Sequence, residues 1–100
     1  MDTTVTARHC EIPAAVRERA RMVMERMAKV AHRPQRAEVI FDVDHQRKRV
    51  ELKLHLPRGS TRVATAEAAD FRTALDRAAA KLRRQVQRTN SRYTRRSAAG

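Results

Sequence analysis

The residues of this chain best suited to do chemistry are basic side chains that recur at helical spacing near its C-terminus. No Asp or Glu occurs from Arg77 to Gly100. The basic residues of this stretch are Arg77, Lys81, Arg83, Arg84, Arg88, Arg92, Arg95 and Arg96. Most of them are three or four residues apart, which on an α-helix places them within an arc of about 80°. This basic row consists of Arg77, Lys81, Arg84, Arg88, Arg92 and Arg95. Because such a row repels itself unless a polyanion lies beside it, the spacing predicts binding to a phosphate backbone.

A solvated helix face is the alternative interpretation of the basic row. Such faces usually mix charge signs to gain favourable pairs along the helix, whereas the last acid here is Asp76. A second row on an earlier predicted helix consists of Arg19, Arg26 and Arg33, with Lys29 beside it, and for this row binding and solvation both stay open. If the two helices pack side by side, both rows could line one groove that fits folded RNA or the phosphates of a duplex.

The overall charge also favours a polyanionic partner. The formal net charge is +12 over 100 residues, which exceeds the magnitude of about 2–8 that keeps a small domain soluble. Nucleic acid is the expected partner, with an anionic membrane surface second. Few aromatic residues are present for single-stranded bases to stack on, namely Phe41, Phe71 and Tyr93.

Catalysis and metal binding are not predicted. The histidines His9, His32, His45 and His55 share no spacing, and with a lone Cys10 they form no zinc or nucleophile constellation. We therefore expect no enzyme activity, cofactor or small-molecule substrate. Glu51 and His55 share an exposed strand face and are interpreted as members of polar cross-strand pairs, and Cys10 as a small packing residue.

The location predicted from these patterns is cytoplasmic. The single cysteine allows no internal disulfide, which suits a reducing compartment. No apolar run approaches the roughly 20 residues of a membrane span, and the N-terminus lacks the pattern of a signal peptide.

Period-two and helical patterns predict a β-α-β-β-β-α order. Strands are expected at residues 3–10, 37–43, 49–56 and 61–67, and helices at residues 13–31 and 71–92. The first β-α-β unit should be a right-handed parallel crossover, and two hairpins should extend the sheet antiparallel. The predicted fold is an α+β two-layer sandwich, with a four-stranded mixed sheet and both helices on one face. Residues 1–92 would form the domain and residues 93–100 a flexible basic tail.

Several segments, in order, resemble the ribosome hibernation-promoting factors and the related ribosome-associated inhibitor Y. The first is Val5-Thr6-Ala7-Arg8-His9-Cys10-Glu11-Ile12, followed by Ala15-Val16-Arg17. The later ones are Leu54-His55-Leu56-Pro57, Ala64-Thr65-Ala66-Glu67, Asp70-Phe71, Ala74-Leu75-Asp76 and Lys81-Leu82-Arg83-Arg84-Gln85-Val86. The resemblance covers residues 5–92, and the family fold is likened to double-stranded RNA-binding domains. Departures occur at Val23, at Val30-Ala31 and at Arg72, where the family usually carries a basic, two aromatic and a tyrosine residue.

The resemblance implies a translation inhibitor that acts without making or breaking a bond. Such a protein binds rRNA of the small ribosomal subunit at the decoding region, in the mRNA and tRNA channel, and preserves idle ribosomes during stress and stationary phase. The family's rRNA-contacting positions correspond to Arg26, Lys29, Lys81, Arg84, Arg88 and Arg92, and the basic row adds Arg77. The chain resembles the short form without the dimerisation domain of the long factors, and two expectations stay open: action on single ribosomes only, or pairing of ribosomes together with a second hibernation factor. The alternatives are a general RNA- or DNA-binding protein, such as an RNA chaperone or ribosome assembly factor, and a partner-binding module without nucleic acid.

Overall fold

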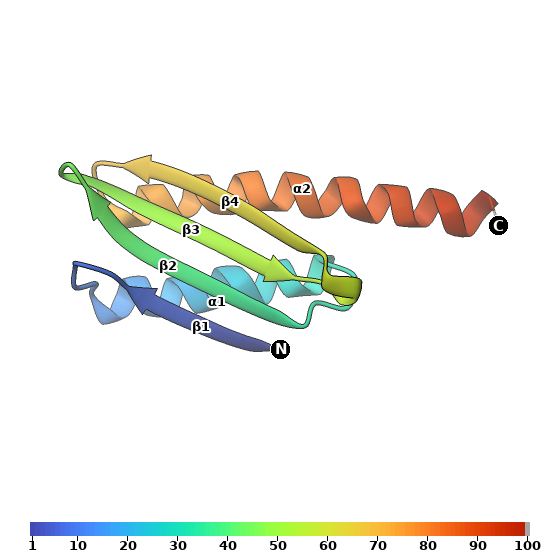
Figure 1. The fold of residues 1–100 in the computed structure, drawn as a ribbon, viewed down its shortest axis with the longest axis horizontal. Coiled ribbons are helices and arrows are strands. Elements are labelled where there is room, and N and C mark those ends of the chain that lie inside the picture. The colour runs from blue at the N-terminus through green and yellow to red at the C-terminus, as the bar shows by residue number, and fades with distance from the viewer. Residues whose placement is uncertain (100) are drawn as a thin grey trace.

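Four strands and two long helices follow one another in the predicted β-α-β-β-β-α order (Figure 1). The computed structural model describes the backbone of residues 1–99 and the side chains of residues 1–88. The elements are β1 (Asp2–Ala7), α1 (Ala14–Val30), β2 (Arg36–Asp44), β3 (Arg47–His55), a short 3₁₀ helix η1 (Pro57–Gly59), β4 (Thr61–Ala68) and α2 (Phe71–Ala99). None of the helices described is long and apolar enough to cross a membrane.

The strands form one mixed sheet in the spatial order β1-β2-β3-β4. β1 pairs with β2 in parallel, as expected for strands joined through a helix, and the other two pairs are antiparallel hairpins. Val39 lies opposite Leu52 and Phe41 opposite Val50, so the apolar residues of β2 and β3 share one face. This sheet confirms the predicted fold class.

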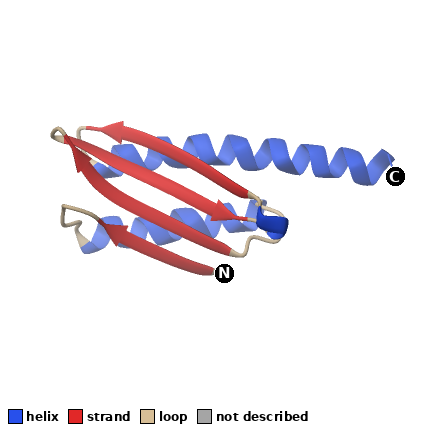
Figure 2. Ribbon diagram, viewed as in Figure 1, coloured by secondary structure: helices blue, strands red, loops and turns tan. Residues whose placement is uncertain are grey.

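Both helices cover that apolar face and leave the other face open (Figure 2). The core is built from alternate strand residues and one side of each helix. Its buried residues are Ala20, Met24, Met27, Ala37, Val39, Phe41, Val50, Leu52, Leu54, Leu56, Ala64, Ala66, Ala68, Ala74, Leu75, Ala78, Leu82 and Val86. The rings of Phe41 and Phe71 meet edge to face with their centroids 5.4 Å apart, which joins the start of α2 to the middle of the sheet.

Small residues set the approach of α2 to the sheet. Ala64, Ala66 and Ala68 of β4 are all buried, and α2 lies over this strand. The helix begins after Asp70, whose carboxylate accepts a hydrogen bond from the Thr73 amide at 2.8 Å and so acts as its N-cap. This hydrogen bond also lowers the pKa of Asp70.

Two element boundaries differ from the sequence prediction by more than two residues. β1 ends at Ala7 and not at residue 10, because the Arg8 amide makes a last bond to the Phe41 carbonyl at 2.8 Å and His9 then takes a left-handed φ of 57°. α2 continues past Arg92 to Ala99, in a stretch that contains no Gly or Pro to end it. Flexibility of residues 93–100 stays a prediction.

Candidate nucleic-acid interface

The helices α1 and α2 run in the same direction on the covered face of the sheet (Figure 1). A bidentate ion pair joins them: Arg19 Nε and Nη2 donate to the two carboxylate oxygens of Asp76 at 3.1 and 3.2 Å. Arg19 belongs to the second basic row of the sequence analysis. Because its charge is already compensated by Asp76, the structure removes Arg19 from the candidate binding residues.

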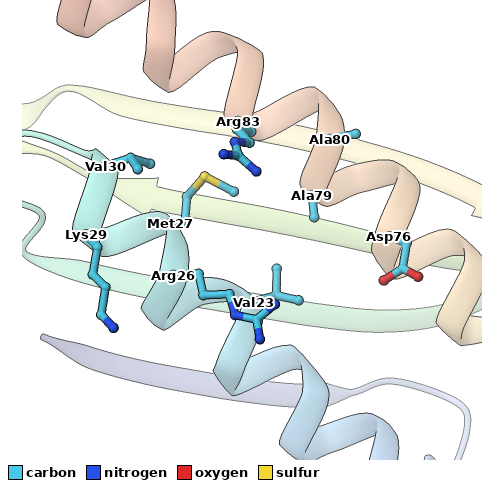
Figure 3. A pocket seen from close by; sticks show the side chains of 9 residues that line it. All are labelled: Val23, Arg26, Met27, Lys29, Val30, Asp76, Ala79, Ala80 and Arg83. Carbon is cyan, nitrogen blue, oxygen red and sulfur yellow. The ribbon is translucent and has the colours of Figure 1, made fainter.

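A groove of about 600 Å³ lies between the two helices. Its lining residues are Val23, Arg26, Met27, Lys29, Val30, Asp76, Ala79, Ala80 and Arg83. In Figure 3, Val23, Met27 and Ala79 point into the space between the helices, and Arg83 reaches from α2 toward Met27. Lys29 extends away from α2 on the outer side of α1.

Arg83 is the residue that spacing alone missed. It falls outside the basic row, yet it faces α1 because it lies one helical turn after Ala79, which packs beside the core and lines the same groove. The spacing of four residues from Ala79 is the sequence signal that could have predicted that Arg83 faces α1. A groove between the two helices therefore exists, but the expectation that both basic rows line it is wrong: its cations are Arg26 and Arg83, with Lys29 at the outer rim, and the basic row of α2 does not line it.

The first two members of the basic row donate hydrogen bonds to main-chain carbonyls of β4, the edge strand of the sheet. Arg77 Nη1 donates to the Glu67 carbonyl at 3.1 Å, and Lys81 Nζ donates to the Thr65 carbonyl at 2.9 Å. Gln85 continues the series, since its Nε2 donates to a third β4 carbonyl, that of Val63, at 2.8 Å. We call these three bonds the edge ladder.

Matched repeat lengths explain the edge ladder. Every second carbonyl of an edge strand points outward without a partner strand, and two residues of strand rise about 6.6 Å. Four residues of α-helix rise about 6 Å, so side chains four residues apart on α2 meet carbonyls two residues apart on β4. The amino and guanidinium groups of the row thus satisfy main-chain acceptors that would otherwise face solvent or another chain.

Seven other cations of the two helices have no such partner among the described residues. They are exposed, and none of their side chains makes a hydrogen bond or ion pair with the rest of the chain up to residue 88: Arg21, Arg26, Lys29, Arg72, Arg83, Arg84 and Arg88. The backbone of Arg92 continues α2, but its side chain lies outside the described residues.

The open face of the sheet is charge-balanced by comparison. Arg47 pairs with Glu67 at 3.5 Å and Lys53 with Glu51 at 3.7 Å. His55 Nε2 lies 2.7 Å from Glu38 Oε2, which confirms the predicted cross-strand polar pairing for His55, whereas the partner of Glu51 is Lys53 of the same strand. Charge that is not compensated within the described chain is therefore concentrated on the helical side.

The hydrogen bond with His55 is the main cause of a lowered pKa at Glu38. Partial burial opposes this effect, and the positive charge of Arg36 adds to it. Cys10 behaves as predicted for a packing residue: it packs against the core, and its thiol lies 3.7 Å from the Phe41 carbonyl. Burial, followed by the charge of Asp42, raises the pKa of this thiol, so it is not an activated nucleophile.

Together, the fold and the cationic helical face define a small basic α+β sandwich suited to a polyanion. A model of the family described as sigma 54 modulation protein / S30EA ribosomal protein matches residues 3–94, so the chain belongs to this family. The resemblance to hibernation-promoting factors inferred from the sequence is confirmed.

Two solved structures share the fold. A ribosomal subunit interface protein from Coxiella burnetii is 25% identical, with a TM-score of 0.79 over 91% of this chain and 99% of that chain. The N-terminal domain of Protein Y from Thermus thermophilus is 27% identical, with a TM-score of 0.76 over 89% of this chain and 99% of that chain. A comparison with curated proteins gave no match.

Proposed function

We propose that this protein binds the small ribosomal subunit through its helical face and inhibits translation by occupying the sites of mRNA and tRNA. The observation that carries the proposal is the contrast between the uncompensated cations of α1 and α2 and the paired charges of the open sheet face. Membership of the S30EA family supports the ribosome as partner. The protein would act in the cytoplasm on idle ribosomes, with no cofactor and no catalytic step.

The proposed rRNA contacts fall into two groups. Arg84 and Arg88 lie on the exposed side of α2, with Arg92 the next basic residue of the row, and Arg26 and Lys29 lie on α1. Arg83 joins them because it lines the groove. Arg77 and Lys81 add positive charge that attracts phosphate at longer range, while their Nη1 and Nζ atoms donate hydrogen bonds to carbonyls of β4.

The proposed inhibition is electrostatic and steric. Cations that replace the counterions of phosphates make binding strongly dependent on salt, with a log–log slope of about −0.9 for each neutralised phosphate on the B-DNA scale. Neutralising about six phosphates would give a slope near −5. A rigid two-layer domain held in this way excludes the ligands that need the same space.

The test compares two variants that lose the same charge from opposite faces. Arg84→Gln with Arg88→Gln removes two exposed cations of α2, and Arg36→Gln with Arg49→Gln removes two exposed cations of β2 and β3. We expect the α2 variant to lose cosedimentation with vacant small subunits at moderate salt and to show a slope smaller in magnitude by about 2. The sheet variant should cosediment like the native protein.

Equal loss in both variants would mean that net charge alone, and not the helical face, governs binding. A cryo-EM map of the native protein on vacant ribosomes provides an independent test. Density outside the mRNA and tRNA channel would contradict the proposed mechanism.

A general RNA- or DNA-binding role is the second candidate. It is favoured by the scarcity of aromatic platforms and by cations placed to bind phosphate and not to read base edges. Comparable affinity for naked RNA duplex and for whole ribosomes, measured at the same salt concentration, would select this candidate over the first.

A further inference from the structure

We propose that the groove between α1 and α2 receives one unstacked nucleobase of the bound RNA. This inference rests on the proposed function and adds a requirement to it: an unpaired nucleotide at the site, in addition to phosphate charge. The uncompensated cations explain affinity for a phosphate backbone, but they do not explain an apolar floor between the helices.

The floor of the groove has the chemistry of a surface for a flat ring. Val23, Met27 and Ala79 present aliphatic groups and a thioether, which can pack against either face of a base. The volume of about 600 Å³ lies within the range of about 300–1,000 Å³ typical of small-ligand sites. Where RNA is recognised in unpaired form, its splayed bases commonly enter such sites.

The rim of the groove has the charge that a nucleotide needs. Arg83 on α2 reaches over Met27, and Arg26 stands on the facing helix (Figure 3). A guanidinium group can stack on a base or hold the flanking phosphates, and these two are not paired with any other described residue.

The two ends of the groove differ in charge, which orients the nucleotide. Asp76 lies at one end, where its carboxylate is held by Arg19. Phosphate is therefore expected at the other end, beside Arg26 and Arg83. Arg84 follows Arg83 directly on α2, so the RNA backbone on either side of a base in the groove would meet the exposed cations of the same helix. This continuity favours RNA over an acidic peptide as the occupant.

The experiment measures the affinity for two RNA hairpins that differ only in one bulged adenosine. Fluorescence anisotropy would give the dissociation constants at fixed salt. Stacking of one base in a protein site contributes about 1–3 kcal/mol, so we expect the native protein to bind the bulged hairpin roughly tenfold more tightly than the paired one. Ala79→Leu, which fills the floor without changing charge, should reduce this ratio to near one and leave the affinity for the paired hairpin unchanged.

Two further variants keep the result interpretable. Ala15→Leu adds the same side chain at an exposed position in the first turn of α1, and it should keep the native ratio. Arg83→Gln, at an exposed position where folding is not at risk, should lower the ratio and also weaken binding to the paired hairpin by the loss of one charge. Circular dichroism would confirm that each variant is folded.

The inference is overturned if the native protein binds both hairpins equally, or if folded Ala79→Leu keeps the native ratio. Displacement of the bulged hairpin by an acidic peptide but not by free adenosine monophosphate would also overturn it, because the groove would then belong to a protein partner. The proposed function survives each of these results if the variant with Arg84→Gln and Arg88→Gln still fails to cosediment with ribosomes. If that variant cosediments like the native protein, the proposed function is contradicted whatever the hairpins show.

Discussion

Neighbouring cations on α2 have different physical roles although they carry the same charge. Lys81 donates to a strand carbonyl, Arg83 faces the groove and Arg84 is exposed. Gln85 continues the edge ladder with a neutral amide, which indicates that this position requires a hydrogen-bond donor and not a positive charge. A count of basic residues therefore overstates the number available to a polyanion.

At the residue scale, the Glu38–His55 pair should make stability depend on acid pH. The pKa of Glu38 is lowered in the folded protein, so the unfolded chain binds a proton at a higher pH than the folded one does. The stabilisation is therefore present above the ordinary Glu pKa of about 4.3 and is lost as pH falls through the lowered folded value. We expect urea midpoints of the native protein to fall between about pH 5 and pH 3.

Glu38→Gln should show a shallower fall over that pH range, because the variant has no carboxyl group at this position to protonate. Glu25→Gln, at an exposed position of α1 with no partner among the described side chains, is the matched control and should keep the native pH profile. A profile for Glu38→Gln as steep as the native one would show that another acid causes the effect.

At the scale of elements, the sequence predicted each helix and strand and the covered face of the sheet. Alternation along β2 and β3 and helical spacing along α1 and α2 reflect burial on one side, and burial is the dominant local signal. The same spacing grouped the basic row on one side of α2, and the described members Arg77, Lys81, Arg84 and Arg88 lie on that helix outside the core. It could not say which flank of that helix faces α1 and which faces β4, because this depends on the order of strands in the sheet. For that reason the spacing does not single out Arg83, and it does not predict the hydrogen bonds of Arg77 and Lys81 to β4.

The edge ladder should limit association through β4. Lys81→Met keeps the aliphatic stem and removes the donor, so the Thr65 carbonyl is left open to water or to another strand. We expect a loss of roughly 0.5–1 kcal/mol in the free energy of unfolding and more self-association at high concentration, measured by chemical denaturation and light scattering.

Lys81→Gln is the informative companion to Lys81→Met. It removes the same charge but keeps a donor of the type that Gln85 already uses one turn further along α2. It should stay as stable and as monomeric as the native protein. Identical behaviour of the two variants would show that the charge, and not the hydrogen bond, protects the edge.

At the scale of the whole molecule, charge is distributed unevenly between the two layers. Among the described residues, uncompensated positive charge is concentrated on the helical side, while ion pairs balance the open face of the sheet. Like charges on one face repel one another in the free protein, and a bound polyanion relieves this repulsion. The same side chains that favour binding should therefore reduce the stability of the unbound domain.

Salt should consequently stabilise the free protein while it weakens binding. The Debye length falls from about 30 Å at 0.01 M to about 8 Å at 0.15 M, so repulsion across the helical face is screened over this range. We expect Tm to rise by a few degrees, which for a domain of this size corresponds to under about 1 kcal/mol. Arg84→Gln with Arg88→Gln should show a higher Tm at low salt and a smaller rise, whereas Arg36→Gln with Arg49→Gln should not. A Tm that does not depend on salt would contradict the uneven distribution of charge.

The alanines of β4 have a consequence for how this domain can vary. Ala64, Ala66 and Ala68 lie beneath α2, so their size sets the height of that helix above the sheet and with it the width of the groove between α1 and α2. A change from Ala66 to Val would thicken this layer and move Arg83 relative to Arg26 without altering any residue of the groove. Relatives with identical groove residues could therefore differ in what the groove accepts, through the two extra carbons by which a buried valine differs from alanine.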